Sequence, residues 1–146
     1  TFHSGGPLLR FSVDGHVVGD TVQLPGNGGT VEVQVEAESV LPIHVLEVVQ
    51  EGRVVASSEE AKGARKLSLK AEVTIDGHSW LAARCSGPNY FEGVPHYDGW
   101  GRGIMAHTSP VYIACGGEWW IFDQETAQYM MTLVEGALHY IRHNSR

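Results

Sequence analysis

Residues 65–75 read RKLSLKAEVTI, and apolar and polar side chains alternate along this stretch without a break. The apolar positions are Leu67, Leu69, Ala71, Val73 and Ile75. A period of two places successive side chains on opposite faces of a strand, so one face meets a core and the other meets water. The stretch therefore predicts a half-buried β-strand, which ends at the turn dipeptide Asp76-Gly77.

The same kind of pattern recurs over most of the chain. Thr30 to Glu38 alternates as cleanly, and Ile43 to Gln50 is apolar on both faces, which predicts a place near the sheet centre. Asp14-Gly15 and Glu51-Gly52 predict hairpin turns. The polar stretch from Ser57 to Ala64 is interpreted as an exposed loop. Further strands are predicted at Leu8–Val13, Val17–Val18, Arg53–Ala56, Ser79–Ser86 and Pro110–Cys115.

The C-terminal part changes period. Asp123 is a suitable N-cap, and Arg142 and His143 suit the C-terminal end of a helix dipole. Apolar residues between them recur at spacings typical of an amphipathic helix over about residues 124–142. They are Ala127, Met130, Met131, Val134, Ala137, Leu138 and Ile141.

About seven strands without βαβ alternation predict an all-β fold, an antiparallel β-sandwich closed by this one helix. The helix is expected to pack its apolar stripe on a sheet or on a neighbouring domain. The 146 residues fit one domain, spanning residues 1–146.

Charge and composition limit the partners. The formal net charge is −7 and no basic cluster is present, which argues against nucleic acid. No apolar run approaches the length of a membrane span, so no membrane partner is expected. The cellular compartment stays open. Cys85 and Cys115 are interpreted as buried thiols within strands, with a cross-strand disulfide as the alternative.

The sequence contains no complete catalytic motif. Gly77-His78-Ser79-Trp80-Leu81 lacks the last glycine of a nucleophile elbow. The histidine spacing fits no common metal motif; His139 and His143 share a helix face, but as surface residues near its end. We therefore predict no catalytic residue and no metal or other cofactor for this chain.

The long segment from Gly87 to Ser109 is the main candidate site, since segments of this length are often functional. Its candidate residues, with the two that flank it on strands, are Arg84, Tyr90, His96, Tyr97, Asp98, Trp100, Arg102 and His107. They suit a surface for a carbohydrate or other small ligand. The alternatives are that the aromatic side chains fill the end of the sandwich or pack on a partner domain. Convergence of His96, Asp98 and His107 around one cavity would instead indicate an enzyme.

Arg84 lies in an apolar strand, where an unpaired guanidinium would be costly. We expect it to have a carboxylate or carbonyl partner, or to face an interface.

Several segments together resemble the region that follows the catalytic module in CehA/McbA-type metallohydrolases of the PHP (polymerase and histidinol phosphatase) superfamily. The resemblance covers nearly the whole chain through short motifs, and 106–113 is the most specific of them. The segments are Thr1-Phe2-His3-Ser4-Gly5-Gly6-Pro7-Leu8-Leu9, Val13-Asp14-Gly15, Gly19-Asp20, 42–54, Ser79-Trp80-Leu81-Ala82-Ala83-Arg84, Ala106-His107-Thr108-Ser109-Pro110-Val111-Tyr112-Ile113 and the C-terminal helix.

The resemblance implies an immunoglobulin-like accessory domain without catalytic residues of its own. Its partner would be an upstream PHP-type module of the same chain, which holds the divalent metal. Arg84 and His107 fall in the two motifs most associated with the family, although no catalytic role carries over to either. An isolated domain of this kind is expected to self-associate through Met130-Met131 or Trp119-Trp120.

Overall fold

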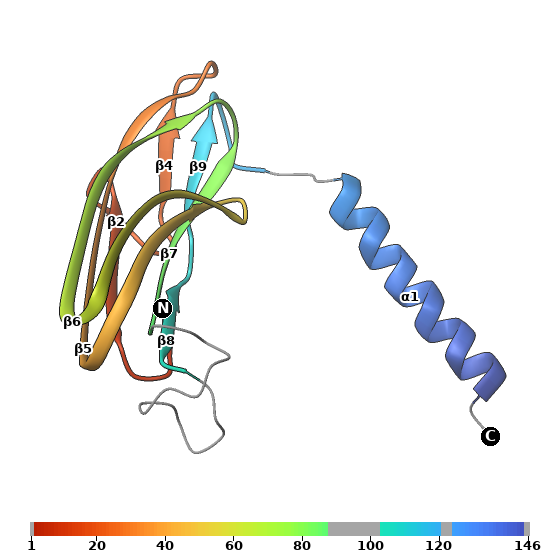
Figure 1. Ribbon diagram of the computed structural model, residues 1–146. Coiled ribbons are helices and arrows are strands. Elements are labelled where there is room, and N and C mark those ends of the chain that lie inside the picture. Colours follow the sequence, from red (N-terminus) through yellow and green to blue (C-terminus); the bar gives the residue numbers. More distant parts are fainter. Residues whose placement is uncertain (1, 88–102, 121–123, 145–146) are drawn as a thin grey trace.

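The computed structural model describes residues 2–87, 103–120 and 124–144. It is mostly β-structure with one C-terminal helix, and its strands form a curled sheet in which nearly all pairs are antiparallel (Figure 1). The elements are β1 (Phe2–Ser4), β2 (Leu8–Val13), β3 (His16–Val17), β4 (Thr21–Leu24), β5 (Gly29–Gln50), β6 (Arg53–Ile75), β7 (Ser79–Ser86), β8 (Met105–Thr108), β9 (Val111–Cys115) and α1 (Gln124–Asn144).

Strands β5 and β6 form a long hairpin that joins the two halves of the sheet. Glu51 and Gly52 at its turn have φ values of 49° and 85°, the positive values that a type I′ turn requires. The pairing register shifts between Glu38 and Ile43. Before this irregularity β5 also pairs with β2, and after it β5 pairs with β7. The change of neighbour at one point in β5 is what divides the curled sheet into two halves.

Strands β1, β4, β8 and β9 extend the β7 half, whereas β3 pairs with β2. Strand β7 pairs with β9 near its start and with β8 near its end, and β1 lies beyond β8. Strand β4 runs parallel to β9 at the other side. In Figure 1 the β7, β8 and β9 half faces the half built from β2, β5 and β6.

A cluster of buried side chains fills the inside of the curl. Val33 and Val35 come from the first half of β5, Leu46 from its second half, Leu81 from β7 and Ile113 from β9, and all five are at most 1% exposed. The alternation predicted for residues 30–38 is confirmed, as is the central position of Ile43 to Gln50. Burial of this apolar surface is the main force that holds the two halves together.

Strand β6 departs from the prediction. The expected loop from Ser57 to Ala64 is wrong, because these residues belong to β6 and pair with β5, as Ser57 does with Glu47. In the part of the chain that the structure describes, β6 pairs with β5 alone and so forms an edge. An edge strand needs backbone pairing on one side only and can keep polar side chains in water. For the same reason Leu67 and Leu69 are half-buried rather than fully buried.

The described residues form nine strands rather than about seven. The additional ones include β1, β4 and β8, which have three, four and four residues. Strands of this length offer too few positions for an alternating pattern to be recognised. They are nevertheless important, since β8 and β1 carry part of the candidate site.

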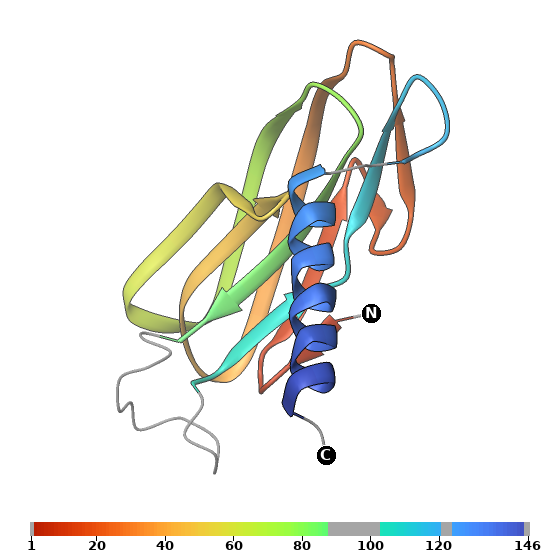
Figure 2. The ribbon, with the colours of Figure 1, turned by 90° about the vertical axis from the view of Figure 1, so that its right-hand side faces the viewer.

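Helix α1 is confirmed, with bounds two residues longer than expected. It does not close the sheet, so the first expected position, packed on a sheet, is wrong. The alternative, packing on a neighbouring domain, stays a prediction. The described α1 side chains from Thr126 onward are exposed, apart from the half-buried Ala127. Figures 1 and 2 show α1 standing apart from the sheet, in front of the outer face of β7, β8 and β9.

Candidate functional site on the outer face of β7, β8 and β9

The alternation of β7 creates two different faces. Leu81, Ala83 and Cys85 point into the core, where each is at most 3% exposed. Trp80 and Arg84 therefore lie on the outer face, together with the small Ala82 between them. A small residue between two large ones leaves a depression in the surface of the sheet.

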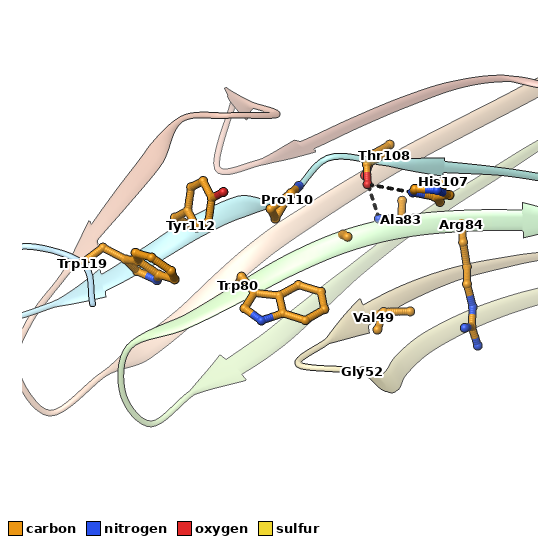
Figure 3. A pocket seen from close by; sticks show the side chains of 11 residues that line it. Val49, Gly52, Trp80, Ala83, Arg84, His107, Thr108, Pro110, Tyr112 and Trp119 are labelled. Carbon is orange, nitrogen blue, oxygen red and sulfur yellow. Dashed lines mark hydrogen bonds between the residues drawn. The ribbon is translucent and has the colours of Figure 1, made fainter. Parts of the chain in front are cut away.

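This depression is an apolar groove of about 540 Å³, shown from close by in Figure 3. Its lining comes from β7, from the end of the β5–β6 hairpin, from β8 and β9, and from the chain after β9. We call it the β7 groove. Its residues are Val49, Gly52, Trp80, Ala82, Ala83, Arg84, His107, Thr108, Pro110, Tyr112 and Trp119.

Tyr112 and Trp119 form one end of the β7 groove, and Trp80 lies beside them. The ring centroids of Tyr112 and Trp119 are 4.6 Å apart at a tilt of 56°, a favourable aromatic arrangement. The Trp119 indole N–H donates a 2.7 Å hydrogen bond to the carbonyl oxygen of Ser79. Trp80 lies on the adjacent strand and faces the middle of the groove (Figure 3). The chain therefore leaves the sheet toward α1 from the aromatic end of the groove.

A row of polar residues crosses the sheet at the other end. Glu47 on β5 pairs in register with Arg84 on β7, Arg84 pairs with His107 on β8, and His107 pairs with His3 on β1. The Arg84 Nε donates a 2.5 Å hydrogen bond to a Glu47 carboxylate oxygen. The His3 and His107 rings lie 5.6 Å apart. We call these four residues the polar row.

The segment from Ala106 to Tyr112 supplies both faces of this region. Ala106 is buried in the core, whereas His107 is exposed in the polar row. Thr108 is buried, and its hydroxyl oxygen accepts a 3.0 Å hydrogen bond from the Ala83 N–H. The Pro110 carbonyl accepts a further bond from the Gly19 N–H. The motif that is most specific to the resemblance thus has a clear structural role at the end of β8 and the start of β9.

The structure brings together only part of the predicted site. Arg84 and His107 are direct cross-strand neighbours, and the expected partner of Arg84 is confirmed as the Glu47 carboxylate. The other candidates lie outside the described residues and remain predictions, as do the ligand surface and the enzyme site built on them. These candidates are Tyr90, His96, Tyr97, Asp98, Trp100 and Arg102.

Sequence reasoning missed several residues of this face. The alternation of Ser79 to Ser86 already places Trp80 and Arg84 on one side, so Trp80 could have been found. His3 and Glu47 carry no local signal, because only the pairing register brings them beside Arg84 and His107.

Two thiols lie beneath this face. Cys85 and Cys115 are buried and free, as the first interpretation of them expected. Burial raises the pKa of the Cys85 thiol to about 11, because a thiolate is poorly solvated there. Burial also raises the pKa of Cys115. Both are therefore protonated at neutral pH.

Helix α1 presents a second apolar surface, apart from the sheet. Eight of its large apolar side chains are at least 45% exposed. They are Tyr129, Met130, Met131, Leu133, Val134, Leu138, Tyr140 and Ile141. The opposite helix side carries Gln128, Thr132, Glu135, His139, Arg142 and His143.

Comparison with family models, curated proteins and solved structures gave no significant match. Within residues 2–87, 103–120 and 124–144, no three His, Cys, Asp or Glu side chains are grouped as a metal site would require. Among the described residues, no helix is both long enough and apolar enough to cross a membrane.

Proposed function

We propose that this chain is a non-catalytic interaction domain of a PHP-type metal-dependent hydrolase, and that the polar row borders the catalytic module. The observation that carries the proposal is the position of β1. This strand pairs with β8, and His3 lies beside His107 in the polar row. A module joined ahead of Thr1 would therefore enter next to Arg84 and His107.

The residue types of the outer face support an interface. Trp, Tyr and Arg dominate the energetics of protein–protein contacts, and a polar rim around an apolar centre is typical of such surfaces. Trp80, Tyr112 and Trp119 supply the apolar part, and the polar row supplies the rim. Arg84 keeps about half of its side chain exposed although it is paired with Glu47, so it remains accessible to a partner.

In this proposal the divalent metal belongs to the catalytic module. Of the potential ligands on the outer face, the polar row offers two imidazoles and one carboxylate, and Glu47 already accepts a hydrogen bond from Arg84. The described residues of the row do not form the three-ligand group that a hydrolytic metal needs. We therefore derive no catalytic step from them.

The fold itself is proposed to be an immunoglobulin-like β-sandwich. The support is that two facing halves of the curled sheet share one core, as the two sheets of a sandwich do. An experimental structure would test this, since aligned sandwich sheets cross at about 30°. A crossing near 90° would contradict it.

The partner is tested in two steps. The coding sequence upstream of Thr1 should encode a barrel rich in histidine and aspartate. That module and this chain, purified separately, should then bind each other in a calorimetric titration. Arg84→Ala and His107→Ala should each weaken binding about tenfold, the loss typical of an interface side chain. Arg10→Ala is the matched control, because Arg10 is a similarly exposed, paired arginine on β2.

Two results would overturn the proposal: an upstream sequence of another kind, or binding that Arg84→Ala and His107→Ala leave unchanged. About one tightly bound zinc, manganese or iron per chain, measured by elemental analysis, would contradict the assignment of the metal to the catalytic module.

A further inference from the structure

The strongest unexplained feature of the molecule is the apolar side of α1. Its exposed large side chains recur on one side of the helix, from Tyr129 to Ile141, and they include two tyrosines and two methionines. Each exposes roughly 100 Å², so together they present roughly 800 Å² of mostly apolar surface to water. The largest apolar patch on a typical monomer is about 300–600 Å². A surface of this size indicates a protein partner.

The charge of α1 argues for a protein rather than a lipid surface. Between Gln124 and Asn144 the helix has one arginine, two glutamates and no lysine. Helices that bind membrane surfaces usually place lysine and arginine along their polar side. The polar side of α1 instead carries neutral residues and Glu135, with Arg142 and two histidines near its end.

The β7 groove has complementary properties. It is lined mainly by apolar and aromatic side chains, and it opens on the face in front of which α1 stands (Figures 2 and 3). Among the described residues, the large apolar side chains of α1 are exposed and no helix lies in the β7 groove. Their chemistry matches, and a helix laid in a groove is a common recognition mode.

The connection to α1 decides which copy provides the helix. Only residues 121–123 separate Trp120 from Gln124, so the two are at most about 14 Å apart. Trp119 is itself part of the groove lining and is tied to Ser79. In the structure α1 nevertheless stands apart from its own groove, so its apolar side is available to a second copy (Figures 1 and 2). A connection of three residues is short, and short connections favour exchange of an element between two copies.

We propose that this chain forms a two-fold dimer in which α1 of each copy occupies the β7 groove of the other. If half of the apolar side of α1 is covered, the two equivalent contacts bury roughly 1,600 Å² in total, the size of a standard stable interface. Arg84 and His107 also line the β7 groove, so this contact and the proposed contact with a catalytic module would use overlapping surfaces. The two proposals remain distinguishable, because a substitution on α1 affects only the helix contact.

The test uses one variant for each side of the contact. Ala82→Glu places a charge on the floor of the groove without removing a packed side chain, because Ala82 is partly exposed. Leu138→Glu places a charge on the apolar side of α1. Molar mass by light scattering over a range of concentrations should show a dimer for the unmodified chain. Each variant should raise the dimer dissociation constant about 100-fold, since an unpaired charge is costly inside an interface.

Matched controls carry the same new charge elsewhere. Ser68→Glu changes an exposed position on β6, and Gln128→Glu changes the polar side of α1. Both should dimerise like the unmodified chain. Circular dichroism and the urea midpoint of each variant establish that it is folded.

Mixing the two variants distinguishes exchange from contact between helices. The Ala82→Glu chain keeps an intact helix, and the Leu138→Glu chain keeps an intact groove, so the mixture should form a heterodimer with one of the two contacts. A monomeric unmodified chain overturns the proposal. So does an Ala82→Glu chain that dimerises normally, which would indicate pairing between helices. A mixture of folded variants that forms no heterodimer also overturns it.

Discussion

The indole N–H of Trp119 donates a 2.7 Å hydrogen bond to the carbonyl oxygen of Ser79, the first residue of β7. Ser79 is 2% exposed, so this carbonyl lies where water has little access. The same indole ring packs on Tyr112. One side chain therefore ties the chain ahead of α1 to two strands and closes the aromatic end of the β7 groove.

Replacing Trp119 should have a measurable effect on stability. Trp119→Phe keeps an aromatic ring near Tyr112 but leaves the Ser79 carbonyl without its donor, so the free energy of unfolding should fall by about 1 kcal/mol. Trp120→Phe is the control, because Trp120 is 64% exposed, and it should change little. Urea denaturation measures both. Equal losses for the two variants would show that the hydrogen bond to Ser79 contributes nothing.

Two glycines with the same backbone conformation should tolerate alanine very differently. Gly15 and Gly28 both have φ +80°. A Cβ on Gly15 meets nothing within 4 Å, whereas one on Gly28 would lie 1.9 Å from the Ile75 carbonyl oxygen. Gly15→Ala should cost about 1–2 kcal/mol of unfolding free energy, which is the strain of the left-handed region. Gly28→Ala should cost clearly more, because the end of β6 must also move.

Urea denaturation measures both variants. Because both pay the same cost of a left-handed backbone conformation, the difference between their unfolding free energies reports the contact at Ile75. Similar losses would mean that the end of β6 near Ile75 yields easily and that the close approach at Gly28 is unimportant for stability.

How much of the molecule could be predicted depends on which interactions are local. The strands at 30–38 and 65–75 followed from alternation. The turn at Asp14-Gly15 followed from backbone preference, and both its φ values are positive, as a type I′ turn requires. The polar row could not be predicted, because Glu47, Arg84 and His3 become neighbours only through strand order and register. The exposed position of α1 could not be predicted either, since its sequence pattern indicates an apolar side but not the surface on which that side packs.

The buried thiols should make stability sensitive to alkaline pH. The folded-state pKa of Cys85 is raised to about 11, above the value of about 8.5 for an exposed thiol. The folded state therefore holds the proton more tightly than the unfolded state does. The contribution of the protonated Cys85 thiol to the free energy of unfolding is therefore fully present below about pH 8.5. It is lost as the pH rises toward about 11.

Cys85→Ala removes this titration. The urea midpoint of the unmodified chain should fall more steeply between pH 8.5 and 10.5 than that of Cys85→Ala, whatever the two midpoints are at pH 7. In the folded chain at pH 8, Cys85 should react slowly with a thiol reagent, and it should react rapidly in denaturant. Fast labelling of Cys85 in the folded chain would contradict its burial.

The ion pair of Arg84 and Glu47 should contribute more to the free energy of unfolding than the pair of Arg10 and Glu36 on the other half of the sheet. Glu47 exposes 21% of its side chain and meets Arg84 at 2.5 Å, whereas Arg10 and Glu36 are both more than half exposed and 3.6 Å apart. Double-mutant cycles with alanine should give a coupling energy of about 1 kcal/mol for Arg84 and Glu47. The coupling of Arg10 and Glu36 should be close to zero and should vanish in high salt. The reverse order would show that partial burial of Glu47 does not strengthen the pair.

Removing α1 should leave the fold intact, because the core cluster consists of sheet residues from Leu9 to Cys115 and includes no residue of the helix. A chain that ends at Trp120 should therefore keep its free energy of unfolding within about 0.5 kcal/mol of the intact chain when both are dilute. At higher concentration the two should diverge, since association stabilises only the chain that can associate. The melting temperature of the intact chain should rise with concentration, and that of the shortened chain should not. A shortened chain that is unfolded when dilute would show that α1 packs on its own sheet in solution. If the melting temperature of neither chain depends on concentration, the chain does not dimerise through α1.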